Sequence, residues 1–169
     1  AVRQAPEDGG DTYYVKYNAS ERVWVECAKT GLANTIDKAT MPHALVRQQD
    51  GSLLLKVIDW DKRLAGDEDT NPSPTFIGQA IKDIFFFKNR LGFVASENVI
   101  LSEVGNYYNF WSKSATDVLD VDMIDIPASS SRINYLNYAI AQNDELIAFS
   151  DNEQFRMLAE GILSPKSAS

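Results

Sequence analysis

The region from Asn71 to Trp111 constrains the fold of this chain more than any other, because it gathers most of the large apolar side chains. Its apolar runs are short and rich in aromatic and β-branched residues, which is typical of strands rather than helices. Turn-forming residues, among them Asn89 and Gly105-Asn106, separate the runs. The region therefore predicts four short strands, which cover residues 84–87, 91–95, 99–101 and 107–111.

Four strands at this spacing are typical of one blade of a β-propeller or of a meander in a sandwich. The chain is accordingly expected to be mainly β, with short antiparallel strands in propeller-blade-like or meander units and little helix. A strand that is buried on one face hides alternate side chains. The residues expected in the core are Phe85, Phe87, Leu91, Phe93, Val99 and Leu101.

Strand pairs are also predicted on both sides of this region. Two apolar alternations flank a short polar connection and predict a hairpin over residues 12–27, and the turn at Gln49-Asp-Gly51 predicts a second hairpin that ends in the strand 53–60. Three further strands are expected at residues 133–141, 145–150 and 154–159. A weak internal repeat supports this pattern, because Leu91-Gly-Phe-Val-Ala-Ser-Glu-Asn resembles Leu146-Ile-Ala-Phe-Ser-Asp-Asn. The two leucines lie 55 residues apart, close to the roughly 40–50-residue blade period of propellers.

The chain divides by composition into two regions. Residues 1–40 are expected to form an N-terminal loop, at residues 1–11, followed by the first hairpin. Residues 41–169 are expected to form a β-rich region, and we interpret the sequence as a fragment that is truncated at both ends.

The charge of the chain bears on its partners. There are 24 acidic and 16 basic residues, the net charge is −8 and the pI is near 4.6, which is the opposite of the basic footprint of a nucleic-acid-binding protein. Cys27 is the single cysteine, so the sequence predicts neither an internal disulfide nor a zinc site built on several cysteines. No apolar run approaches the ~18–20 residues of a membrane span, so membrane insertion is not expected.

Four aspartates suggest one catalytic alternative. Asp117, Asp120, Asp122 and Asp125 lie close together, and Asp120 and Asp122 would share one face of an extended strand. A glycoside hydrolase needs such a carboxylate pair, one as acid and one as nucleophile or base. A solvated strand face has the same pattern, and no apolar pocket is evident that would raise the pKa of one carboxylate. We favour the solvated face and predict no catalytic residue.

Other polar residues suggest no metal or cofactor site. Asp67-Glu-Asp begins like a calcium loop, but Pro72 and Gly78 stand where that loop needs Gly and Glu, which favours a solvated loop. His43 is the single histidine and is expected to be structural. Lys82, Lys88 and Arg90 lie among acidic residues, so local ion pairs are favoured over nucleic-acid contacts, with a structural ion pair for Arg90.

Several motifs together resemble a known family. They are Met41-Pro-His-Ala-Leu, Trp60-Asp-Lys-Arg, Thr70-Asn-Pro-Ser-Pro-Thr-Phe-Ile-Gly, Phe86-Phe-Lys-Asn-Arg-Leu-Gly-Phe, Ser96-Glu-Asn-Val-Ile, Glu145-Leu-Ile-Ala-Phe-Ser-Asp and Leu163-Ser-Pro-Lys. Over roughly residues 41–166 the chain is similar to tail tubular protein B, the nozzle protein of short-tailed bacteriophages.

The resemblance implies a structural protein of the virion that is assembled in the host bacterial cytoplasm. It implies a six-fold homo-oligomeric ring below the portal and adaptor, contacts with tail fibre proteins, and the transient passage of double-stranded DNA through the lumen during ejection. It carries over no catalytic, cofactor or metal residues. Two alternatives stay open, a carbohydrate-degrading tail component that uses Asp120 or Asp122 with Asp125, and a glycan-binding module. The second requires Tyr107, Tyr108 and Trp111 to be exposed.

Overall fold

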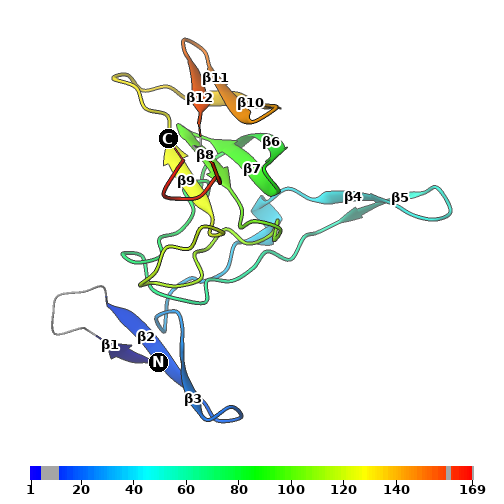
Figure 1. The fold of residues 1–169 in the computed structure, drawn as a ribbon. Coiled ribbons are helices and arrows are strands. Elements are labelled where there is room, and N and C mark those ends of the chain that lie inside the picture. Colours follow the sequence, from blue (N-terminus) through cyan, green and yellow to red (C-terminus); the bar gives the residue numbers. More distant parts are fainter. Residues whose placement is uncertain (5–11, 159–160, 169) are drawn as a thin grey trace.

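The structure, a computed structural model, describes residues 1–4, 12–158 and 161–168, and its strands form four antiparallel sheets (Figure 1). The first and last sheets have three strands, the second is a hairpin and the third has four strands. The strands are β1 (Val2–Gln4), β2 (Tyr13–Asn18), β3 (Val23–Glu26), β4 (Ala44–Arg47), β5 (Leu53–Lys56), β6 (Ile81–Phe87), β7 (Arg90–Ala95), β8 (Asn98–Leu101), β9 (Ile124–Pro127), β10 (Leu136–Gln142), β11 (Glu145–Ser150) and β12 (Gln154–Met157). Within the described ranges the helical structure is one short 3₁₀ turn, η1 (Lys38–Thr40). The mainly β fold that the sequence predicts is confirmed.

Two tight hairpins follow from residues that tolerate left-handed backbone angles. Lys88 and Asn89 have φ values of 48° and 60° and connect β6 to β7, and Asn143, with a φ of 54°, lies in the equivalent two-residue turn between β10 and β11. The β6–β7 turn has positive φ at both central residues, as the type I′ turn that matches strand twist requires, whereas the β10–β11 turn has it at its first residue, Asn143. An ion pair between Lys88 and Asp144 joins the two turns.

The inner strands β7 and β8 of the central sheet are buried on both faces because their side chains alternate between two cores, whereas Phe86 on the edge strand β6 is exposed. Phe85 and Val94 lie in a core shared with the C-terminal sheet, and Phe93 and Ile100 lie in a second, aromatic core on the opposite face. All six residues of β7 are buried. The six side chains that the sequence predicts to be buried are all in one core or the other: Phe85, Phe87, Leu91, Phe93, Val99 and Leu101.

The fourth strand of this sheet is not the one that the sequence predicts. The prediction of a strand at residues 107–111 is wrong, and β9 pairs with β8 instead. The side chain of Asn109 accepts a hydrogen bond from the Trp111 N–H and donates one to the Trp111 carbonyl, which holds this segment in a turn. Phe110 then packs on the face of the sheet rather than along its edge.

The remaining strands are close to their predicted positions. β11 covers residues 145–150 as predicted, β10 begins three residues later than predicted, and β5 ends at Lys56 instead of Trp60. The predicted strand at 154–159 ends at Met157, and residue 159 is outside the described residues. The prediction that residues 1–11 form a loop is wrong for β1, which pairs with β2, while residues 5–11 are outside the described residues.

The internal repeat of the sequence marks equivalent strands. Leu91 lies in β7 and Leu146 lies in β11, which are the strands between β6 and β8 and between β10 and β12. The two meanders pack against each other through the first core, to which Val94, Leu146 and Met157 contribute. The Asp83 carboxylate also accepts a hydrogen bond of 2.8 Å from the Ala139 N–H, which ties β6 to β10.

Gly92 allows the ring of Phe85, its cross-strand partner, to lie directly on the backbone of β7. A Cβ at this position would lie 2.3 Å from two atoms of that ring and 2.9 Å from Leu101 Cδ2. We expect Gly92→Ala to lower the free energy of unfolding by about 1–3 kcal/mol through overpacking. Urea denaturation of Gly92→Ala, Phe85→Leu and the double variant measures this effect. The double variant should lose less than the sum of the two single variants, and strict additivity would contradict the proposed contact.

The N-terminal sheet is attached to the central part of the chain through polar contacts. The Tyr14 hydroxyl donates to Asp67 at 3.1 Å, Ala28 forms a parallel bridge with Gly66, and the Ala115 N–H donates to the Glu26 carboxylate at 2.7 Å. The predicted boundary between residues 1–40 and 41–169 stays a prediction.

Asp67 corrects the expectation of a fully solvated loop after Trp60. Its side chain is buried, and it accepts hydrogen bonds from the Tyr14 hydroxyl and from the N–H groups of Asp69 and Thr70. Burial acts to raise the pKa of Asp67, but these hydrogen bonds, together with Lys29 at 3.8 Å, outweigh burial and hold that pKa below its ordinary value of 3.8. The carboxylate closes the loop on itself and fastens it to β2.

A lowered pKa makes the contribution of Asp67 to stability dependent on pH. The contribution is complete above the ordinary pKa of 3.8 and is lost as the pH falls through the lower folded-state pKa. We expect Asp67→Asn to destabilise the chain by about 1–3 kcal/mol at pH 7. The difference from the original chain should shrink in acid, as measured by thermal unfolding from pH 7 downward. The exposed neighbour offers the control Asp69→Asn, which should leave the profile nearly unchanged; equal effects of the two variants would contradict this assignment.

Candidate assembly surface

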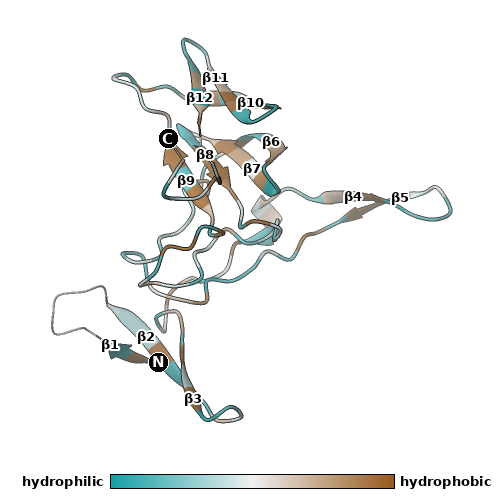
Figure 2. Ribbon diagram, viewed as in Figure 1, coloured by the Kyte–Doolittle hydropathy of each residue, from teal (hydrophilic) through white to brown (hydrophobic). Residues whose placement is uncertain are grey.

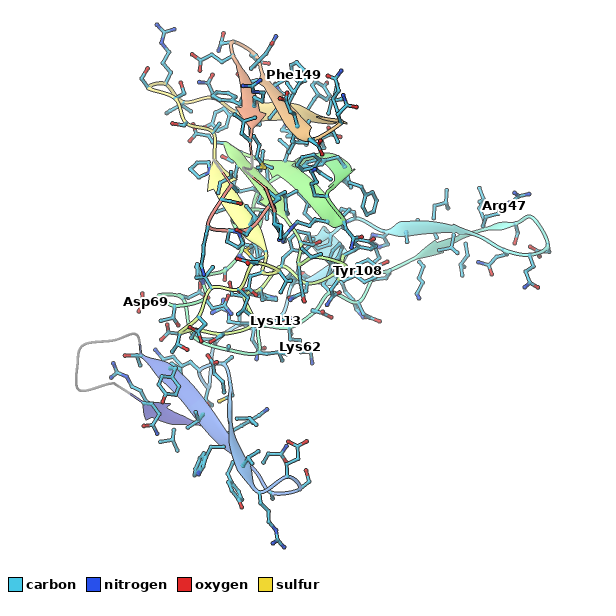
Figure 3. The ribbon with its side chains drawn as sticks, viewed as in Figure 1. Arg47, Lys62, Asp69, Tyr108, Lys113 and Phe149 are labelled. Atoms are coloured by element: carbon cyan, nitrogen blue, oxygen red, sulfur yellow. The ribbon has the colours of Figure 1, made fainter. Side chains whose placement is uncertain are left out.

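The hairpin of β4 and β5 projects from the body as an arm (Figure 1). We define the arm as residues 44–57. Every side chain from Leu45 to Val57 is exposed, with exposed fractions of 63% at Leu53 and 67% at Leu55. Figure 3 shows the side chains standing out on both sides of the arm and places Arg47 near its far end.

The arm is apolar on both of its faces. Register places Leu45 and Leu55 opposite each other on one face, and Val46 and Leu54 opposite each other on the other face. Figure 2 shows the hydrophobic colouring that runs along both strands of the arm. An isolated two-stranded hairpin is marginally stable in water, and exposed apolar surface of this kind marks interaction sites. The arm is therefore built to be covered on both faces.

Sequence reasoning found this hairpin but not its role. A hairpin that lies on a core alternates apolar and polar residues, because one face is wet. Ala44-Leu-Val and Leu53-Leu-Leu instead have apolar residues at consecutive positions. Apolar residues at consecutive positions on both strands could have indicated, from the sequence alone, a hairpin with two apolar faces.

A second surface feature is an apolar groove of about 390 Å³ between the central and C-terminal sheets. It opens between β9 and β12, which are the outermost strands of their sheets. Its walls continue the first core, and the apolar side chains that line it include Val99, Ile126, Leu136, Leu146, Phe155 and Met157. Sequence reasoning did not identify this groove, because it depends on how two sheets diverge.

The four aspartates proposed for catalysis do not form a strand face. Residues 120–122 are in a turn, so the expected shared face of Asp120 and Asp122 is wrong. Asp122 is buried and accepts hydrogen bonds from the Lys113 and Leu119 N–H groups. Asp125 accepts from the Thr75 N–H and hydroxyl and from Asn98. Asp117 is exposed and its N–H donates to Ser114. Asp125 fastens the loop at Thr75 to the central sheet, and Asp122 holds together the loop that precedes β9.

The three aromatics proposed for glycan binding do not form an exposed platform. Trp111 is 2% exposed, its indole N–H donates to the Asp61 carbonyl, and the guanidinium of Arg63 lies 4.5 Å from its ring centre. Tyr107 donates to Asn89, and Tyr108 alone is exposed, at 42%. Figure 3 places Tyr108 on the body near the base of the arm. One exposed ring gives little of the flat surface that a sugar requires.

The remaining polar candidates also have structural partners. His43 Nδ1 lies 3.0 Å from the Met41 carbonyl, and within the described ranges no group of three or more His, Cys, Asp or Glu side chains is placed to hold a metal ion. Lys88 pairs with Asp144, as noted above. Arg90 is structural, but the predicted ion pair is wrong, because its guanidinium donates to backbone carbonyls instead. Cys27 is buried as a free thiol.

Comparison with known proteins shows which class of protein has this β-rich fold with its exposed arm. The chain belongs to the bacteriophage nozzle protein family, which it matches over residues 1–169. It is a structural component of the phage tail and hence of the virion. The particular relative with which it compares is tail tubular protein gp12 of Escherichia phage T7, to which it is 45% identical over 157 residues. This match covers 93% of the chain and 20% of the relative, so the chain spans about one fifth of that protein's length. No helix in the described part of the chain is long and apolar enough to cross a membrane.

Proposed function

We propose that this chain is a module of a phage tail nozzle that forms part of the conduit for genome ejection. The match to the nozzle family over the whole chain carries the proposal. The full protein would assemble as a homo-oligomeric ring of six subunits and would contact portal, adaptor and tail fibre proteins. The arm supports this role, because a surface that is apolar on two faces needs neighbouring protein to cover it.

The role we propose is structural rather than catalytic. The hydrogen bonds of Asp122 and Asp125 to N–H groups and side chains of nearby loops support a structural function for both carboxylates. These carboxylates hold the fold together, whereas a glycosidase pair must face a bound sugar from two sides.

Three-dimensional reconstruction of virions tests the proposal. The phage that encodes this chain should show the two meanders β6–β9 and β10–β12 repeated around the axis of the tail nozzle, with each arm buried against protein. Density for this chain away from the nozzle, or an arm that is solvated in the assembled tail, would contradict the proposal.

A conduit should also allow DNA to slide, which leads to a prediction about charge. Each phosphate that a protein neutralises adds about 0.9 to the salt slope of binding, and this chain has 24 acidic against 16 basic residues. We expect negligible binding of double-stranded DNA at physiological salt, as measured by fluorescence anisotropy. The same titration at low salt is the control. Micromolar binding that weakens steeply with salt would indicate a row of basic residues facing the lumen. It would contradict the prediction that the acidic chain repels DNA.

A further inference from the structure

We propose that the arm of one subunit inserts its leucines into the groove between β9 and β12 of a second copy of this chain. The inference rests on the proposed assembly and names the two surfaces that meet in it. The arm and the named residues that line the groove lie in the described part of the chain, so one chain presents both surfaces.

The chemistry of the two surfaces matches. The arm offers aliphatic side chains on opposite faces, led by Leu54 and Leu55. The groove offers the partly exposed side chains of Ile126 from the central sheet and Phe155 from the C-terminal sheet, and it is lined deeper by buried residues such as Leu146. Leucine side chains of the arm therefore fit against Ile126 and Phe155 and extend a core that already exists.

The edges of the groove add a second kind of complementarity. β9 and β12 are edge strands, and an edge strand presents unpaired backbone donors and acceptors to any strand that lies alongside it. The arm is itself a ribbon with two edges, so backbone pairing of the arm with β9 or β12 would reinforce the apolar contact.

The placement of the two surfaces favours a second copy over the arm's own chain. In Figure 1 the arm points away from the side of the body on which β9 lies. An arm on one side and a groove on the other make a heterologous contact, in which each subunit gives an arm to one neighbour and receives an arm from the other. Repetition of this contact produces a closed ring when the rotation per subunit fits, as the proposed nozzle requires.

Site-directed cross-linking tests the pairing. Val46→Cys places a thiol on the arm, and Gln154→Cys places one at the groove, where both native side chains are exposed. Cys27 is buried, so the chain without a new cysteine gives the background. We expect a short bifunctional maleimide to link the two variants when they are mixed, with at least ten times the yield obtained when Val46→Cys is mixed with the control Ser20→Cys in the β2–β3 turn. Adding Leu54→Asp to the arm variant should abolish the link while circular dichroism shows an unchanged fold.

Three other cross-linking outcomes would overturn the inference, and each can be told apart from a failure of the proposed nozzle function. Links between two Val46→Cys chains alone would show that arms pair with arms, so assembly would stand while the groove assignment falls. An intramolecular link in a chain that carries both substitutions would show that the arm folds onto its own groove. Absence of any link above background at the highest soluble concentration would refute the pairing, whereas the reconstruction of the tail would still judge the nozzle role.

Discussion

Phe93→Ala should lower the free energy of unfolding by about 3–5 kcal/mol, one of the two largest effects that we expect of any single substitution in this chain. Phe93 is fully buried in the aromatic core. Its ring stacks on that of Phe110 at 4.9 Å and meets the edges of Phe76 and Trp60 at 5.3 and 5.9 Å. Truncation removes these contacts and leaves a cavity among rigid rings that collapse poorly.

Chemical denaturation measures this effect, and the neighbouring strand offers a matched control. Phe86 is 61% exposed and packs against Tyr107 alone among the aromatic rings of the described residues. Phe86→Ala should cost no more than about 1 kcal/mol, the scale of one aromatic pair. Similar losses in Phe86→Ala and Phe93→Ala would contradict the division of the sheet into a buried and an exposed set of aromatics.

Arg90→Met should have an effect of similar size, about 3–5 kcal/mol, because it leaves several carbonyls without their donor, at about 1–3 kcal/mol for each buried group left unpaired. The guanidinium is fully buried and donates to the carbonyls of Ser102, Asp120, Asp122 and Leu163. Burial lowers the pKa of Arg90, and the nearby carboxylates of Asp122 and Glu103 act to raise it. Without the guanidinium, several buried carbonyls lose their donor at once.

Arg90→Lys separates geometry from charge in this network. A lysine keeps the charge but has a single nitrogen on a flexible stem, so it cannot reach carbonyls on three segments. We expect Arg90→Lys to lose most of the stability that Arg90→Met loses, as measured by the same denaturation. The exposed Arg132 gives the control Arg132→Met, which should change stability by less than about 0.5 kcal/mol. Full retention of stability in Arg90→Lys would show that charge, not shape, matters at this position.

Comparison with relatives indicates the general role of this chain, and the structure indicates which of its surfaces would contact neighbouring subunits. Family membership establishes a structural tail protein, but it does not indicate which residues meet a neighbour. The arm and the groove do, because the leucines of the arm are exposed in an isolated chain and the groove has Ile126 and Phe155 partly exposed at its surface. We expect the isolated chain to be monomeric or weakly associated, because a single arm in a groove gives weak pairing.

The sequence by itself determined the features that depend on local chemistry. The turn at Asn89 follows from the tolerance of asparagine for left-handed angles, and the short apolar runs of β6, β7 and β8 identified six of the core residues in advance. The equivalence of Leu91 and Leu146 was also visible, since each is the second residue of a strand that runs into a polar turn. In each case residues close together in the chain contain all the information that is needed.

Only the tertiary structure decided the features that depend on residues far apart in the chain. It placed β9 instead of residues 107–111 beside β8, because hydrogen bonds of Asn109 turn that aromatic segment onto the sheet face. It gave Arg90 carbonyl partners up to 73 residues away, where local sequence predicted an ion pair. It also left the arm uncovered and opened the groove between two sheets. Burial by a distant segment cannot be read from a local pattern, because the same apolar alternation forms whether the covering surface belongs to the chain or to a neighbour.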